Sequence, residues 1–290
     1  MPTAALVRTF VRELITRESS ERVTEPDLVM DDPDKVAAYT AAGMVDGVMA
    51  PVYLFHCEQI CDVIRPGDTV VDLGCGPATQ LAMVAELNPE SRFIGVDLSA
   101  EMLDKARRHI ETKGLTNVTF VVSDITAIDQ LADASADVVM STVALHHLPT
   151  LGHLDSAFSE AARILKPGGG LYLVDFGHLK SEKSIEYFAY QYEAQQPELF
   201  TLDYLYSLKA AFGLDDFKRL HARHFGGRAR IHSTFMMPFM VAIKSAPRRD
   251  RDPALKARLA TAFDRMPKTF RKDFKDLKIF FGLGGLSLGA

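Results

Sequence analysis

Between residues 68 and 245 the sequence alternates short runs of β-branched residues with longer amphipathic runs. Strands that are separated by helices are joined by right-handed crossovers, which favours a parallel sheet with helices on both faces. We therefore predict an α/β fold with a doubly wound sheet. The predicted strands span 69–74, 92–99, 118–124, 136–143, 170–176, 229–235 and 239–245, and the predicted core helices span 78–88, 100–114 and 154–169.

Composition places the chain among ordinary globular proteins and excludes several classes. Its 290 residues are 47% hydrophobic and 24% charged, and the formal net charge of −5 argues against wholesale nucleic-acid binding. The three cysteines suggest neither a disulfide framework nor a zinc site, and we expect no metal. No targeting signal or run of about 20 apolar residues is visible, so we expect a cytoplasmic protein without a membrane span.

Three segments flank or interrupt the predicted core, residues 68–247. Residues 1–67 are expected to form a helical N-terminal cap, in which Leu6, Phe10, Leu14 and Ile15 share one helix face. Residues 178–227 hold five of the eight tyrosines and are predicted to be an aromatic substrate lid.

Residues 248–290 are predicted to be a basic helical extension. Eleven Lys or Arg and five Asp lie between residues 248 and 278. A solvated helix, contact with an acidic partner or second subunit, and docking on a membrane surface all remain open for it. The sequence also leaves a homodimer open.

A glycine turn follows the first predicted strand, in the run VVDLGCGPATQ of residues 70–80. In an open parallel sheet, ligands bind beyond the carboxyl ends of the strands, and Gly74 and Gly76 would let a ligand approach the backbone there. Pro77 removes an N–H that a pyrophosphate would use, and the carboxylate of Asp72 would repel an anion. The turn therefore favours a nucleoside-like ligand without a diphosphate.

Two further carboxylates follow the next strands. Asp97 ends the second strand, 23 residues after Gly74, which is where a reader of ribose hydroxyls is expected. Asp124 ends the third strand. The alternative is that each aspartate only caps the helix after it.

The ordered motifs across residues 66–177 resemble those of class I S-adenosylmethionine-dependent methyltransferases of the small-molecule type. The resemblance implies a Rossmann-like, mostly parallel seven-stranded sheet with an antiparallel last strand, and S-adenosylmethionine as the cofactor. It also implies that Asp72, Gly74, Cys75 and Gly76 hold the methionine part, that Asp97 binds the ribose, that Leu98 and Met102 line the ribose and adenine slot, that Asp124 and Ile125 contact the adenine, and that Ser141 and Thr142 offer backbone carbonyls to the ammonium group. Ala78 departs from the third glycine of many members.

The catalytic candidates lie where the methyl group would emerge. His146 and His147 follow the fourth strand, and a histidine can take a proton near neutrality. Because adjacent residues ordinarily point apart, we expect at least one of the pair to be structural. Tyr39 lies on the segment that often covers the cofactor in similar enzymes, and Asp175 and His178 are weaker candidates.

An aromatic wall is also predicted, because Tyr187, Phe188, Tyr190 and Tyr192 recur at helical spacing in the lid. Core packing would give the same pattern. The predicted function is in-line methyl transfer to a small or medium-sized metabolite. The alternatives are aminocarboxypropyl transfer or cyclisation, which release methylthioadenosine; a non-enzymatic cofactor-binding module; and, more distantly, a nicotinamide oxidoreductase.

Overall fold

The computed structural model describes residues 4–17, 19–26 and 47–286. Seven strands form one sheet in the order β3-β2-β1-β4-β5-β7-β6. Neighbouring strands from β3 to β5 are parallel, and β7 is antiparallel to both β5 and β6. The predicted mostly parallel sheet with an antiparallel last strand is thus confirmed. The strands are β1 Thr69–Leu73, β2 Arg92–Asp97, β3 Val118–Val122, β4 Ala136–Thr142, β5 Leu165–Phe176, β6 Ala229–Ser233 and β7 Met240–Ser245.

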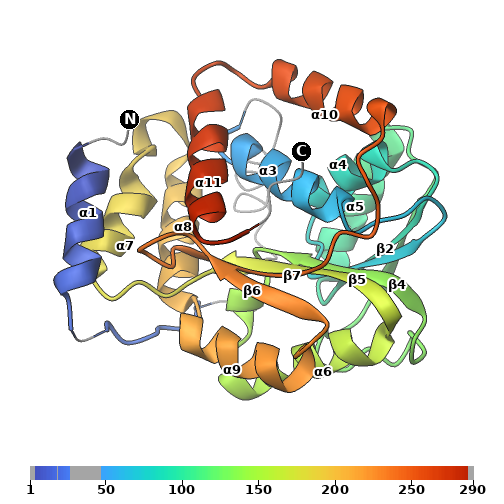
Figure 1. The fold of residues 1–290 in the computed structure, drawn as a ribbon, viewed down its shortest axis with the longest axis horizontal. Helices are drawn as coiled ribbons and strands as arrows, with labels where there is room; N and C mark the ends of the chain where they lie inside the picture. The colour runs from blue at the N-terminus through green and yellow to red at the C-terminus, as the bar shows by residue number, and fades with distance from the viewer. Residues whose placement is uncertain (1–3, 18, 27–46, 287–290) are drawn as a thin grey trace.

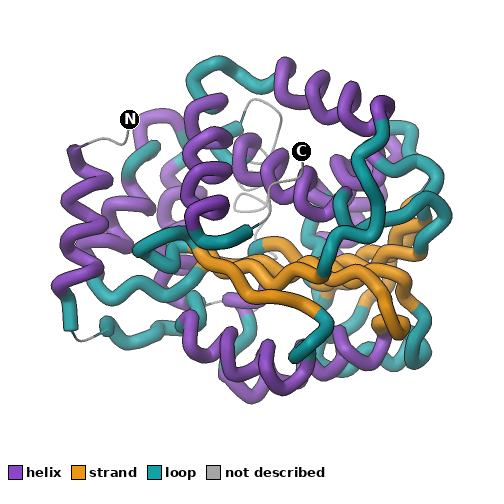
Figure 2. Tube along the Cα trace, viewed as in Figure 1, coloured by secondary structure: helices purple, strands orange, loops and turns teal. Residues whose placement is uncertain are grey.

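Helices cover both faces of this sheet (Figure 1), and the strands form one twisted layer between them (Figure 2). In Figure 1, α3, α4, α5, α10 and α11 lie on one side, while α6 and α9 lie on the other. The helical elements are α1 Ala4–Ile15, α3 Ala50–Cys61, α4 Thr79–Leu87, α5 Ala100–Thr112, the 3-10 turn η1 Leu145–His147, α6 Leu151–Ile164, α7 Glu182–Tyr190, the 3-10 turn η2 Glu193–Gln195, α8 Glu198–Ala210, α9 Leu214–His224, α10 Pro253–Arg265 and α11 Arg271–Leu283.

Alternation along the strands divides the core into two apolar layers. Val70 faces the layer that contains Phe55 and Leu81, whereas its neighbour Val71 faces the layer that contains Phe158. Successive side chains of a strand point to opposite faces, so a strand that is buried on both sides is apolar throughout. This explains why the predicted strands contained near-continuous Val, Ile and Leu.

The largest differences from the predicted boundaries occur where α6 meets β5. The helix expected over residues 154–169 is α6, which begins at Leu151 and ends at Ile164. The side chain of Thr150 accepts a hydrogen bond from the backbone N–H of His153 and caps its start. Pro167 and Gly168, which has φ of +71°, cannot continue a helix, and β5 therefore starts at Leu165.

The N-terminal helix α1 buries only part of the predicted face, because Leu6 and Phe10 pack against the core but the last two residues of that face do not. Leu14 and Ile15 are exposed, whereas Glu13 is buried. The Glu13 carboxylate accepts hydrogen bonds from the backbone N–H groups of Lys180, at 2.9 Å, and Ser181, at 3.1 Å. These bonds hold α1 at the start of α7, so a polar contact overrides the apolar periodicity.

The segment predicted as an aromatic lid is divided between two places. Helices α7 and α8 pack against each other, and α1 packs on α7. Helix α9 packs instead on α6, where Phe217 and Phe225 join the core layer of Phe158. The lid function of 178–227 stays a prediction. Within this segment, α7 and α8 are the helices that could form such a lid.

The basic extension packs onto its own chain. Phe281 of α11 is fully buried and stacks on Phe55 of α3, with ring centroids 5.2 Å apart. Asp62, which caps the end of α3, accepts hydrogen bonds from Arg251 and from the buried ammonium group of Lys244, at 2.7 and 2.8 Å. The positive charge of the extension is thus matched in part by acidic groups of this molecule.

Among the described residues, no helix combines the length and apolar character needed to cross a membrane.

Candidate active site

The glycine turn is closed by hydrogen bonds from its own amides. Gly74 has φ of +72°, and a Cβ at this position would lie 2.6 Å from that of Ala144. The N–H groups of Gly74 and Cys75 donate to the carbonyl of Val96 at 2.8 and 3.0 Å. The N–H of Gly76 donates to Asp97 Oδ2 at 2.8 Å. These amides are occupied and Pro77 has none, so the turn does not cradle a diphosphate.

Asp72 and Asp97 form an acidic pair beyond β1 and β2. Burial, together with the nearby Asp97 carboxylate, raises the pKa of Asp72 well above its usual range. Burial also raises the pKa of Asp97, although N–H groups of Ser99 and Gly76 partly offset it. A bound cation or a pair of hydroxyl donors would favour the ionised forms of both carboxyls.

Asp97 is not the cap of the helix after it. Ser99 is the N-cap residue of α5, and its side chain accepts a hydrogen bond from the N–H of Met102. Asp97 instead accepts from the N–H of Ser99 at 3.0 Å and from the glycine turn. Its carboxylate thus spans the gap between the carboxyl ends of β1 and β2, where a ribose is expected.

Sequence reasoning missed two polar residues beside this turn. A cavity of about 30 Å³ is lined by Asp72, Gly74, Thr79, Gln80 and Thr142, with other residues of the turn. The buried atoms Thr79 Oγ1, Gln80 Oε1 and Thr142 Oγ1 have no hydrogen-bond partner among the described residues. Buried polar atoms are normally satisfied, so these three suit a polar ligand such as an amino-acid group. The sequence did contain a signal for Thr79 and Gln80, because they lie in the first turn of the helix that follows the glycine turn, where ligands often bind.

The other predicted cofactor residues lie around the same sheet edge. Leu98 is 52% exposed, while Met102 and Ile125 are buried. Cys75 lines the small cavity, but its thiol packs beneath the backbone of Gly95. Ser141 Oγ donates to the carbonyl of Leu73 at 2.7 Å.

Asp124 is exposed, and it caps a turn, because the described residues between it and β4 contain no helix. Its Oδ1 accepts from the N–H and the hydroxyl of Thr126, both at 2.8 Å. A contact of Asp124 with adenine stays a prediction.

His146 is held by a buried carboxylate. Its Nδ1 lies 2.7 Å from Asp175 Oδ1, and its backbone N–H donates to Asp175 Oδ2 at 2.9 Å. The His146 side chain is 2% exposed, and Nε2 has no hydrogen-bond partner among the described residues. Nε2 lies 3.8 Å from Glu25 Oε1, so the His146 ring is placed between the carboxylates of Asp175 and Glu25. Asp175, the weaker sequence candidate, therefore orients His146.

His147 lies beside His146, so the two neighbours do not point apart as predicted from the sequence. Both side chains line a cavity of about 20 Å³, and their ring centroids are 4.2 Å apart. The 3-10 turn η1 brings the neighbours onto one side. His147 Nδ1 is hydrogen-bonded to Glu25. This bond lowers the pKa of Glu25 to about 2 despite the burial of its carboxyl group, and it raises the pKa of His147.

Glu25, His146 and His147 could also hold a metal ion. One ligand atom from each lies within 4.8 Å of the others. The absence of a metal therefore stays a prediction.

Arg22 anchors the N-terminal segment that also contains Glu25. Its guanidinium donates to the carbonyls of His146, Leu148, Pro149 and Ala210 at 2.7–3.1 Å. It also lies 3.9 Å from the ring centroid of Phe212. No motif marked Arg22 or Glu25, because their partners lie more than 120 residues away in the chain.

Backbone strain occurs next to the histidines. Val143, which lines their cavity, has φ of +53° although it is β-branched. Such residues rarely adopt left-handed geometry, and this strain commonly marks functional sites.

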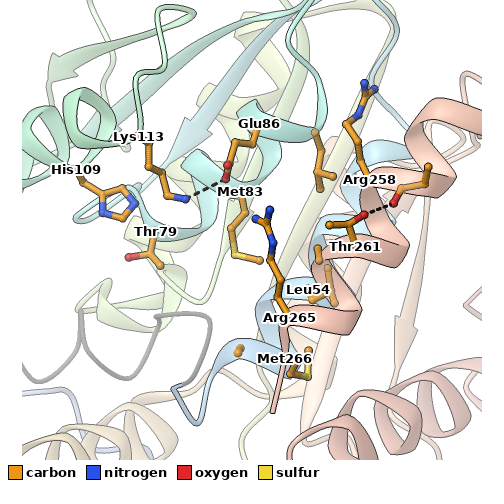
Figure 3. Close-up of a pocket in the computed structure, with 14 residues that line it drawn as sticks. Leu54, Thr79, Met83, Glu86, His109, Lys113, Arg258, Thr261, Arg265 and Met266 are labelled. Carbon is orange, nitrogen blue, oxygen red and sulfur yellow. Dashed lines mark hydrogen bonds and ion pairs between the residues drawn. The ribbon is translucent and has the colours of Figure 1, made fainter. Parts of the chain in front are cut away.

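A larger cavity than the two at the glycine turn and the histidines lies elsewhere. A groove of about 500 Å³ runs between α4, α5, α3 and α10 (Figure 3). Lys113 is hydrogen-bonded to Glu86 across it, and Arg265 reaches over Met83. Of its lining residues, Thr79 also reaches the small cavity of the glycine turn.

Two sequence candidates remain, Tyr39 and His178. Tyr39 lies outside the described residues. His178 is hydrogen-bonded through Nε2 to the hydroxyl and carbonyl oxygens of Ser20 and holds the N-terminal segment.

Known proteins resemble this chain across the same region. Residues 64–206 match the family model described as a methyltransferase domain. The chain is 32% identical over 167 residues to an uncharacterised 37.1 kDa protein in transposon TN4556 of Streptomyces fradiae, covering 56% of this chain and 45% of that protein. It is 34% identical over 129 residues to the arsenite methyltransferase of Aquipseudomonas alcaligenes, covering 42% of this chain and 36% of that enzyme. It spans less than half the length of these curated relatives.

A solved structure agrees in fold over nearly the whole chain. The plantazolicin methyltransferase BpumL in complex with SAH matches with a TM-score of 0.58, 16% identity, and coverage of 92% of this chain and 96% of that one. This likeness shows the fold. The family-model match separately identifies a methyltransferase domain over residues 64–206 of this chain.

Proposed function

We propose that this protein transfers the methyl group of S-adenosylmethionine to a small or medium-sized metabolite. The observation that supports this most directly is the meeting of two groups at the carboxyl ends of the strands. The acidic pair Asp72 and Asp97 lies on one side, and the His146–Asp175 pair lies on the other, beyond β4 and β5. The first group suits the cofactor and the second suits an acceptor.

The residues of the glycine turn fit the proposed cofactor. Asp97 would accept from the ribose hydroxyls, and Asp72 with Thr79 and Thr142 would surround the methionine ammonium and carboxylate. When bound, the cofactor supplies a methyl group on a positively charged sulfur. The chain's own task is then to align the acceptor with that methyl group and to exclude water.

His146 is proposed to take the proton of the acceptor. Its Nε2 would take up that proton, and Asp175 together with Glu25, whose Oε1 lies 3.8 Å from Nε2, would stabilise the imidazolium that forms. His147 would remain paired with Glu25 and fix the position of that carboxylate. An acceptor that loses a proton, such as an alcohol, phenol or amine, therefore suits the site.

The reaction is tested by mass spectrometry of the cofactor product. Methyl transfer predicts S-adenosylhomocysteine (SAH) and a methylated acceptor. Release of methylthioadenosine would contradict methyl transfer and favour transfer or cyclisation of the methionine side chain.

A variant tests the proton acceptor. His146→Asn should lower kcat with a hydroxyl acceptor by about 100-fold or more, because general-base catalysis contributes about this much. Its affinity for SAH, measured by calorimetry, should stay within about twofold. The matched change His153→Asn, at an exposed histidine, is the control. An unchanged kcat in the His146 variant would remove it from the mechanism.

The structure does not test the expectations about partners and location. A homodimer, the lack of nucleic-acid binding and a cytoplasmic location stay predictions.

A further inference from the structure

We propose that the acceptor is a neutral or cationic hydroxyl compound with a flat, apolar body of about two fused rings. This inference rests on the proposed methyl transfer and specifies its substrate class. It is carried by a second cavity that adjoins the one at the histidines.

The two cavities share part of their walls. The cavity at His146 and His147 measures about 20 Å³, and a larger one of about 190 Å³ lies between α1, α3, α7, α8 and α11. Met49, Phe200 and Tyr204 line both. The hydroxyl of the proposed acceptor would lie at His146, and its body would lie beside these three side chains, in the larger cavity.

Aromatic rings form a continuous wall along this route. The ring of Phe176 lies 5.5 Å from that of His146, 5.5 Å from that of Tyr204 and 5.9 Å from that of Phe239. Phe239 stacks on Phe188 at 4.1 Å. Flat apolar molecules pack well against such rings, because stacking adds to the gain from buried apolar area. Phe188 thus contributes to the predicted aromatic wall.

The charged residues of the two cavities disfavour an acceptor that carries a negative charge. Among the described lining residues of the larger cavity, Lys272 is the only cation, and it is paired with Asp276 at 2.5 Å. Asp273, which accepts from the Tyr192 hydroxyl at 2.7 Å, also lines this end. At the inner end, Glu25 already neutralises His147. A carboxylate or phosphate on the acceptor would find no unpaired cation here.

The volume of the larger cavity suits a body of about two rings. An apolar cavity of about 150 Å³ admits one benzene ring. The larger cavity and its inner extension together exceed this modestly. A bicyclic body therefore fits without displacing the aromatic wall.

Three matched probes test the charge preference. These are 2-naphthol, 6-(aminomethyl)-2-naphthol and 6-hydroxy-2-naphthoate, titrated by calorimetry into the protein saturated with SAH. We expect the neutral and cationic probes to bind at least about tenfold more tightly than the carboxylate. Equal or tighter binding of the carboxylate would overturn the proposal.

A graded series tests the location. Val52 of α3 is half-buried and lines the larger cavity. Val52→Leu and then Val52→Phe should weaken 2-naphthol binding progressively, by at least about tenfold in the Phe variant, because they fill the volume that the rings need. The matched control Ala262→Phe fills the groove of Figure 3 and should leave 2-naphthol binding unchanged.

SAH affinity separates this inference from the proposed function. Variants that retain SAH binding are folded, so unchanged 2-naphthol binding in both Val52 variants would place the acceptor elsewhere. Failure of the unaltered protein to bind SAH would instead contradict the proposed function.

Discussion

At the scale of single residues, the carboxylate of Asp97 joins the glycine turn to the second strand. It accepts from the N–H groups of Gly76 and Ser99. Asp97→Ala should weaken SAH binding by more than about tenfold, because two charge-assisted hydrogen bonds to the ribose are lost. Calorimetry measures this, with Asp129→Ala at an exposed position as the control. Unchanged affinity would remove Asp97 from the cofactor site.

At the scale of secondary-structure elements, α11 is part of the core layer that contains α3. Phe281 is fully buried and stacks on Phe55. Phe281→Ala should lower the free energy of unfolding by about 3–5 kcal/mol, the usual cost of removing a buried aromatic ring. Ile279→Ala, at a side chain 54% exposed on the same helix, should change it by about 0.5 kcal/mol or less. Urea unfolding compares them, and equal effects would show that α11 is not docked in solution.

At the scale of the whole molecule, cofactor binding, stability and pH are coupled through Asp72 and Asp97. Both have raised pKa values, and a ligand that donates hydrogen bonds favours the ionised forms. SAH binding should therefore release protons, and its affinity should rise as the pH rises above the ordinary aspartate range. At 100 times its Kd, SAH should add about 2.7 kcal/mol to the free energy of unfolding.

Thermal unfolding with SAH, with NAD as the control, checks this coupling. Calorimetry in buffers of different ionisation enthalpy counts the protons. Stabilisation by NAD but not by SAH would favour the nicotinamide alternative, and proton uptake would contradict the role of the acidic pair.

Much of the sheet could be predicted because its signals are local. The strand around Val70 and Val71 is apolar on both faces, and the turn at Gly74 requires a conformation that glycine adopts readily. The end of α6 was misplaced because apolar spacing continues through Leu165 into a strand. The buried face of α1 was partly misjudged because Glu13 has partners 167 and 168 residues away.

The sequence by itself determined the alternation of strands and helices, the glycine turn, and the carboxylates and histidines that follow the strands. Each of these depends on neighbouring residues, through periodicity, turn chemistry or position at a strand end. Only the tertiary structure decided that Glu25 meets His147, that Asp175 orients His146, and that α11 joins the core. Such contacts bring together segments far apart in the chain, and the packing of the whole molecule selects them because no local preference encodes a distant partner.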